Sequence, residues 1–364
     1  MDAVRDKNTN ALISAAAVVV IVFGMQAAKV LLVPFLLAVF LALITVRPML
    51  WLQQRRVPSV AAALLIVTAL MLLLAVVGGI VGRSIADFTA ALPTYQERLD
   101  TIVQGTIRFI AGFLDDPTDL TDVGALIDPG WAMRQAASIL TALQDVLTNT
   151  FLILFTMVFM LLEASSMAVK IRAAFGQDAS SFERPRQFLH NLGRYMGIKT
   201  IVSVATGLCA SLLTWWIGLD FPLLWGMLAF LFNYVPAIGS IIAAVPAVLM
   251  ALIQLGIGEA GSTAIAFLAI NMVFGNAIEP RLMGYGVGIS PLVVFIGLVM
   301  WGWIFGPVGM FLSVPLTMTV KMALEAHEHT RWLAILIGSE RDAEYALAQQ
   351  HMDEEEKQQS TAPE

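Results

Sequence analysis

The most informative part of the chain is the stretch NMVFGNAIEPRLMGYGVGISPLVVFIGLVMWGWIFGPVGMFLSVPLTMTVK, residues 271–321. It is apolar enough to lie in a membrane, yet it is interrupted by Glu279-Pro280-Arg281 and again by Gly306-Pro307-Val308-Gly309. The apolar run 221–255 is interrupted in the same way, by Asn233-Tyr234-Val235-Pro236-Ala237-Ile238-Gly239. Backbone released from helical hydrogen bonding at membrane depth lines cavities rather than lipid. Two interrupted helices in one chain are therefore typical of a transport site.

The composition indicates a helical membrane protein. Of its 364 residues, 58% are hydrophobic and 13% are charged, whereas charged residues make up about a quarter of a typical soluble domain. Several apolar runs exceed the roughly 18 residues of a spanning helix, and they are continuous, unlike the short alternating segments of a membrane barrel. The chain shows no basic cluster suited to nucleic acid. Its single cysteine, Cys209, permits no disulfide framework.

We predict an all-α polytopic membrane protein with about five to six full transmembrane helices, two interrupted segments and a small extracytoplasmic helical insert. A helix over the run 221–255 would be about 52 Å long, whereas the hydrocarbon core is about 30 Å thick. We therefore expect 221–255 and 290–323 to fold as re-entrant hairpins with tips at 233–239 and 306–309. The full spans are expected near 11–28, 30–46, 58–82, 146–168, 198–217 and 262–279, the first two forming a tight hairpin that turns near Lys29.

Lysines and arginines in short loops predict the orientation. With the first two spans as a hairpin, the basic clusters fall on one side, so both termini are expected on the cytoplasmic side of a bacterial inner membrane. The chain then divides into five regions. These are a scaffold of three spans at 1–82, an extracytoplasmic helical insert at 83–145, the fourth span and its cytoplasmic connection at 146–197, a transport core at 198–325, and a cytoplasmic tail at 326–364.

The beginning of the insert carries a heptad seam. Its apolar residues recur at alternating steps of three and four, which predicts a long helix that continues the third span out of the membrane. We expect this helix to end at Asp115-Asp116-Pro117 and a second helix to start at Asp128. The seam is expected to pack on that second helix, on another subunit around a symmetry axis, or on both, and we expect a homo-oligomer. Its members are Ile85, Phe88, Leu92, Tyr95, Leu99, Ile102, Phe109 and Phe113.

Glu279 is the leading candidate for binding a solute or a coupling ion, because a carboxylate near membrane depth is costly and usually functional. Pro280 is expected to block the helix and leave carbonyl groups free beside it. Asn276, three residues before Glu279, would share its helical face, whereas Asn271 is offset. The alternative is a salt bridge from Glu279 to Arg281, or to a lipid headgroup, at the cytoplasmic rim.

Asn233, at the tip of the first interruption, either hydrogen-bonds the solute or serves only as a turn residue. The expected binding set is therefore Glu279, Asn276, Asn233, Asn271 and Arg281. The hinge and turn residues, which shape the site without contacting the solute, are Pro236, Gly239, Pro280, Gly306, Pro307 and Gly309.

Catalytic and metal-binding motifs do not emerge from the sequence. His327 and His329 stand two residues apart, so their rings would diverge on a helix, and we expect no metal site. The chain has no hydrolase elbow, phosphate loop or HExxH motif. We therefore expect no enzyme and no cofactor, with Na⁺ or H⁺ as the candidate coupling ion.

Two signatures resemble those of the AI-2E transporter family. The first is LLWGMLAF at 223–230, followed by NYVP at 233–236 and by Ile238-Gly239. The second combines FGN at 274–276, EPRLMG at 279–284, WGW at 301–303, GPVG at 306–309 and SVPLT at 313–317. The resemblance covers roughly residues 10–340 and is close to the autoinducer-2 exporter branch. It implies export of that small polar signal, while related branches are associated with sodium/proton antiport.

These observations predict an inner-membrane secondary transporter for a small polar solute, in which the core at 198–325 shifts against the scaffold within the lipid bilayer. One alternative is a cation/proton antiporter that uses Glu279 as its exchange group. Another is a membrane scaffold that binds partners through its insert and its acidic tail. The polar residues near Glu279 argue against the scaffold, because a scaffold does not need a carboxylate at membrane depth.

Overall fold

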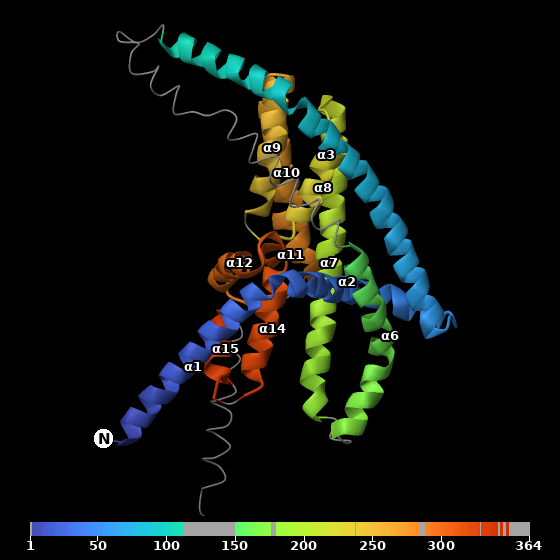
Figure 1. Cartoon of the computed structure of the whole chain (residues 1–364), viewed down its shortest axis with the longest axis vertical. Helices are drawn as coiled ribbons and strands as arrows, with labels where there is room; N and C mark the ends of the chain where they lie inside the picture. Colours follow the sequence, from blue (N-terminus) through green and yellow to red (C-terminus); the bar gives the residue numbers. More distant parts are fainter. Residues whose placement is uncertain are drawn as a thin grey trace, which may run out of the picture. The chain divides into compact units, whose positions relative to one another are not determined.

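The structure is a computed structural model and describes residues 2–111, 150–175, 180–236, 238–283, 288–327, 329–340, 343–344 and 347–348. Its regular structure in these ranges is entirely helical, which confirms the all-α class (Figure 1). The chain divides into two compact units. The first unit comprises Met1–Ile44, Met167–Gly197 and Pro280–Glu364, and the second comprises Thr45–Ser166 and Ile198–Glu279. The two interrupted runs therefore belong to different units, and the five predicted regions stay a prediction.

Within the described ranges, four helices are long and apolar enough to cross a membrane: Lys29–Gln54, Ser59–Thr106, Gln187–Ile217 and Ile257–Met283. Shorter apolar helices accompany them. The predicted fourth span corresponds to one of these shorter apolar helices, the part of α6 (Thr150–Phe175) from Thr150 to Glu163. The chain is thus a membrane protein, whereas the number of full spans and the re-entrant course of the interrupted runs stay predictions.

The expected tight hairpin near Lys29 is wrong. Helix α1 (Asp2–Ala27) and helix α2 (Lys29–Gln54) are separated by one residue, Ala28. The Ala28 amide donates to the Gly24 carbonyl, and the Leu32 amide donates to the Ala28 carbonyl, both at 3.0 Å. Helical hydrogen bonding therefore continues through the junction, whereas a chain reversal needs a loop of about two to five residues. The helix therefore bends at Ala28 without a loop (Figure 1).

Helix α3 (Ser59–Ala111) confirms that the third span continues as one long helix. Its 53 residues correspond to about 80 Å, so a membrane-spanning part must continue well beyond a hydrocarbon core of about 30 Å. The expected helix end at 115–117 and the second helix of the insert lie outside the described residues.

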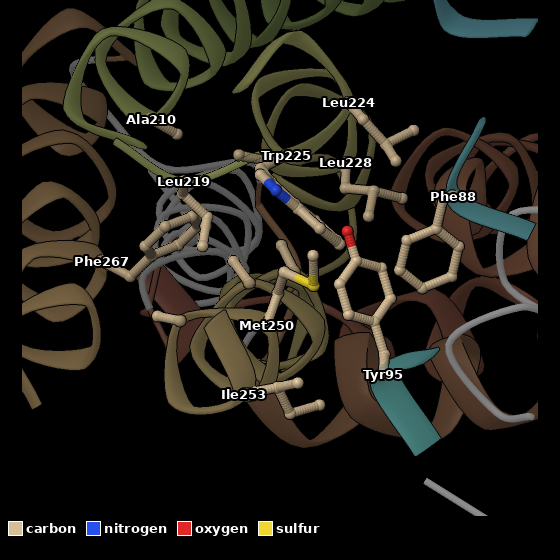
Figure 2. Packing of buried hydrophobic residues seen from close by; sticks show 14 of the residues in the cluster. Phe88, Tyr95, Ala210, Leu219, Leu224, Trp225, Leu228, Met250, Ile253 and Phe267 are labelled. Atoms are coloured by element: carbon tan, nitrogen blue, oxygen red, sulfur yellow. The ribbon is translucent and has the colours of Figure 1, made fainter. Parts of the chain in front are cut away.

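The part of the heptad seam from Ile85 to Leu99 packs on α8 (Pro222–Phe232) and α9 (Gly239–Gln254) of the same chain, within the second unit, and the sequence did not suggest these partners. Figure 2 shows the Phe88 ring directed toward Trp225, with the two centroids 6.1 Å apart in an edge-to-face arrangement. Tyr95 donates its hydroxyl to the Asp220 carboxylate at 3.1 Å. A heptad pattern specifies a buried face without specifying its partner, so the sequence could not identify α8 and α9 as the elements that cover it.

Replacing Phe88 by alanine should destabilise the second unit by about 3–5 kcal/mol, because a buried ring is lost and a cavity remains. Only 1% of the Phe88 side chain is exposed. The matched control is Leu73→Ala on the same helix, where the side chain is 57% exposed and few contacts are lost. Thermal unfolding of the purified protein in detergent compares the two. Equal shifts for both variants would contradict the packing described for the seam.

The first interrupted run forms a helical hairpin, α8–α9, that crosses α7 (Ser180–Ile217) at very short range. A Cβ atom on Gly207 of α7 would lie 2.7 Å from the Gly226 carbonyl oxygen, and one on Gly226 would lie 2.6 Å from the Gly207 carbonyl oxygen. The two glycines thus permit backbone contact between α7 and α8, as small residues do in membrane helix pairs. In Figure 1, α10 (Ile257–Asn271) lies beside α9.

The second interrupted run is confirmed in the first unit as α12 (Pro291–Phe305), α13 (Pro307–Phe311) and α14 (Ser313–Glu325). Gly306 separates the first two with φ 70° and ψ −148°, a backbone conformation available essentially only to glycine. Pro307 follows at the start of α13. Proline has no backbone amide hydrogen to donate, which costs nothing there, because amides in the first turn of a helix have no partner within the helix. The short helix α15 (Arg331–Ile337) packs on α14.

Candidate functional site

Glu279 directly follows a widened stretch of helix. Helix α10 passes into a π-helical segment, Met272–Ile278, and the chain then continues as α11 (Glu279–Met283). The Glu279 amide donates to the Phe274 carbonyl, five residues back. The expectation that Pro280 blocks the helix is therefore wrong: the wider π turn precedes the proline and the helix continues past it. Such π segments occur often at functional sites.

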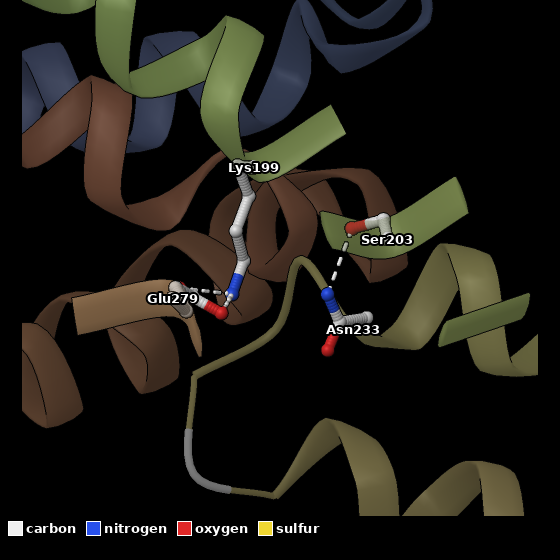
Figure 3. Close-up of polar contacts among 4 residues, drawn as sticks. All are labelled: Lys199, Ser203, Asn233 and Glu279. Carbon is white, nitrogen blue, oxygen red and sulfur yellow. Dashed lines mark hydrogen bonds and ion pairs between the residues drawn. The ribbon is translucent and has the colours of Figure 1, made fainter. Parts of the chain in front are cut away.

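The Glu279 carboxylate is held by Lys199 of α7, both within the second unit. The ammonium nitrogen of Lys199 lies 2.6 and 2.8 Å from the two carboxylate oxygens of Glu279 (Figure 3). The exposed side-chain fractions are 8% for Lys199 and 15% for Glu279. The alternative partner suggested by the sequence, Arg281, is exposed and is not the residue that holds this carboxylate.

Lys199 is not in the binding set expected from the sequence. A usable signal was present. Lys199, Ser203 and Thr206 recur at steps of four and three, the spacing of one helical face. All three are buried in α7. A cation at the start of a polar stripe within an apolar helix is expected to face a partner rather than lipid.

The same face of α7 holds the first helix break. Asn233 caps the C-terminus of α8 and donates its side-chain amide to the Ser203 hydroxyl at 2.9 Å (Figure 3). The next residue, Tyr234, donates its hydroxyl to Thr200 at 2.8 Å. Asn233 is 8% exposed. It is therefore more than a turn residue, since its side chain joins the break to α7.

A small cavity of about 10 Å³ lies in the second unit between α7, the α8–α9 hairpin and α10. Its lining combines hydroxyl and amide side chains with apolar ones. The lining residues are Thr206, Ala210, Ala229, Asn233, Ser240, Ala243, Phe267, Ile270 and Asn271.

The expected binding set is only partly brought together. Asn233 and Asn271 share the cavity lining, and Glu279 is paired to the same helix, α7. Asn276 is exposed. It lies in the π segment, where each residue turns the chain through a smaller angle than in an α-helix, so a spacing of three residues no longer places Asn276 on the same face as Glu279. Arg281 is exposed as well and belongs to the first unit.

The expected hinge residues lie where the helices are interrupted. Gly239 begins α9, and a Cβ there would overlap the Phe232 carbonyl. Gly309 lies in α13, where a Cβ would overlap the Trp301 carbonyl. Pro236 lies in the turn between α8 and α9. Whether any of these residues moves during a functional cycle stays a prediction.

Comparison with known proteins matches residues 13–329 to a family described as AI-2E family transporter. The chain is similar to the AI-2 transport protein TqsA of Escherichia coli K12, with 35% identity over 88% of this chain and 92% of that protein. It shares 37% identity with a putative transport protein of Haemophilus influenzae, over 91% and 97% of the two chains. The putative transport protein YhhT of E. coli K12 is 33% identical over 91% and 94%.

Proposed function

The chain belongs to the AI-2E transporter family, and on that premise we propose that it is a secondary transporter that exports a small polar solute such as autoinducer-2. Export would cross the bacterial inner membrane by alternating access, with the C-terminal tail in the cytoplasm and the protein working as a homo-oligomer. The basic residues after the fourth and the last span support this side for the C-terminus, whereas the side of the N-terminus loses its support with the hairpin near Lys29. The α3 seam is not the contact between subunits in this proposal, because α8 and α9 already cover it.

The observation that carries the proposal is the Lys199–Glu279 ion pair. It joins two helices that are each long and apolar enough to cross a membrane, Gln187–Ile217 and Ile257–Met283. Removing two charges from water is expensive, and a buried ion pair is weak evidence for stability. Ionisable residues at membrane depth usually mark the path of a substrate or ion. A role in transport explains why this pair exists.

The geometry supports a solute site with a charged part and a neutral part. Lys199 donates to both oxygens of Glu279, so a solute hydroxyl could bind that carboxylate only by displacing the ammonium group. Asn233 and Asn271 offer neutral amides at the cavity. Binding would then loosen the contact between Lys199 and Glu279 while forming others at the α8–α9 break. Such an exchange of partners is one way for a ligand to favour a second conformation.

A second candidate, cation/proton antiport, draws support from the same pair. The Glu279 carboxylate already binds a cation, the Lys199 ammonium, at 2.6 Å. A metal cation or a proton could compete with this ammonium for the carboxylate. Na⁺ or H⁺ is accordingly the proposed coupling ion whichever solute moves.

Purified protein in proteoliposomes should move autoinducer-2 faster than protein-free liposomes, with a rate that depends on an imposed sodium or pH gradient. The measurement is solute appearance outside the vesicles over time, under each gradient separately. If the protein dissipates a pH gradient on sodium addition and moves no solute, antiport replaces export as the function. If neither occurs in a correctly assembled protein, the scaffold interpretation is favoured.

A further inference from the structure

The Thr206 hydroxyl is a buried polar group that the function described above does not use. Thr206 lies in α7, lines the cavity and is 7% exposed. Its hydroxyl oxygen has no hydrogen-bond partner within the described part of the chain. A buried hydroxyl without a partner is costly, so a native structure that retains one usually supplies a partner from outside the chain.

Other threonines in the helices of this protein make a hydrogen bond within their own helix that Thr206 does not make. In this fold, threonine hydroxyls commonly donate to the carbonyl four residues earlier, which satisfies them within their own helix. On α7 itself, Thr214 donates to the Ala210 carbonyl at 2.8 Å. The same bond is made by Thr89, Thr101, Thr106, Thr156, Thr263, Thr317 and Thr319. The Thr206 hydroxyl is thus available to the cavity.

The size and lining of the cavity limit what can bind there. A volume of about 10 Å³ is close to the minimum for a single water molecule. The polar lining consists of Thr206, Asn233, Ser240 and Asn271, which are all neutral. Hydroxyl and amide groups offer both donors and acceptors, which suits a group that also donates and accepts. A bare ion in these apolar surroundings would lack a counter-charge in the lining.

We propose that this cavity is a subsite for one neutral hydroxyl group, with Thr206 as its main contact. Water fills it in the solute-free protein, and one hydroxyl of the transported solute fills it during transport. The second half of this inference rests on the proposed function, whereas the first half does not. The subsite would make the transporter selective for neutral, hydroxylated solutes that can also reach the Asn233 and Asn271 amides.

Whether water fills the cavity in the solute-free protein is tested by the thermal stability of Thr206 variants. Thr206→Val keeps the side-chain shape and removes the hydroxyl. If a water molecule bonds that hydroxyl, the valine variant should unfold at a lower temperature than wild type, while Thr206→Ser, which keeps the hydroxyl, should lose less. Thr214→Val is the matched control on the same helix, because its hydroxyl is satisfied by helix carbonyls. A valine variant at 206 that is as stable as wild type, or more stable, would show that the cavity is dry and overturn the proposal.

Transport measurements test the second half. In proteoliposomes with autoinducer-2 as the probe, Thr206→Val should raise KM about tenfold, the effect of losing one good hydrogen bond. The maximal rate should change little, and Thr206→Ser should resemble wild type. An unchanged KM beside a destabilised valine variant would mean that only water uses the subsite, which overturns the second half. If wild type moves no autoinducer-2, the proposed function fails, and the stability comparison still decides whether water occupies the cavity.

Discussion

Replacing Glu279 by glutamine should abolish solute flux and also destabilise the protein. The replacement leaves the Lys199 ammonium, whose side chain is 8% exposed, without its anionic partner. Breaking a buried ion pair on one side costs about 3–5 kcal/mol, mostly because the remaining charge stays buried. Lys199→Met should destabilise to a similar degree for the same reason. Both single variants should therefore lose flux and stability together.

The double variant Lys199→Met, Glu279→Leu separates the two losses. Replacing both charges with apolar side chains of similar size is often neutral or stabilising, so this variant should recover most of the wild-type thermal stability. Its flux should remain absent, because the carboxylate and the ammonium group are both gone. Thermal unfolding and proteoliposome flux, measured on the same preparations, give the two readouts.

The Lys321–Glu325 pair supplies a control for the ion-pair variants. These residues lie four apart on α14 with 3.6 Å between Nζ and Oε1, and the Glu325 side chain is 50% exposed. Glu325→Gln should reduce stability by no more than about 0.5 kcal/mol and leave flux intact. Wild-type flux in Glu279→Gln would make the Lys199 pair structural and would direct attention to Asn233 and the α8–α9 break.

Replacing Gly239 or Gly309 by alanine should prevent correct folding. The added methyl group would overlap the Phe232 carbonyl at position 239 and the Trp301 carbonyl at position 309. Backbone atoms cannot move aside as a flexible side chain can, so each interrupted helix would have to separate from its preceding segment. We expect a loss of more than about 4 kcal/mol, within the range reserved for severe core defects.

Gly261→Ala tests whether helical glycines in this protein tolerate a methyl group in general. Gly261 lies in α10, and a Cβ atom added there would meet no atom of the described chain within 4 Å beyond its chain neighbours and its own helix backbone. Alanine at this position should stabilise slightly, by up to about 1 kcal/mol, through its higher helix propensity. The readout for all three variants is the yield of monodisperse protein after membrane extraction. Normal yields for the 239 and 309 variants would contradict the close backbone contacts at both breaks.

Much of the fold could be predicted from local sequence. The apolar runs predicted the helical membrane class, and the length of 221–255 predicted two short helices in place of one. Glycine and proline predicted where the helices are interrupted, since Gly306 adopts a conformation that other residues avoid. The bend at Ala28 was mistaken for a hairpin, because one lysine after a long apolar run resembles a loop signal although the helical hydrogen bonds continue.

The candidate site was only partly predictable. Glu279 and Asn233 were identified from their position beside interrupted apolar runs, and the structure bonds both to α7. Lys199 and Thr206 were missed. The partner of Glu279 lies 80 positions away in the chain, and no local spacing rule relates residues so far apart.

Properties that depend on a few neighbouring residues could be predicted before the fold was known: the membrane class, the helix breaks, the long α3 helix and the family signatures. The folded chain was needed to show which buried faces meet. It paired the α3 seam with the α8–α9 hairpin, paired Lys199 with Glu279, and placed Thr206 beside Asn233 and Asn271. Periodicity shows that a face is buried, whereas the partner of that face is selected by the shape and charge of segments distant in the chain.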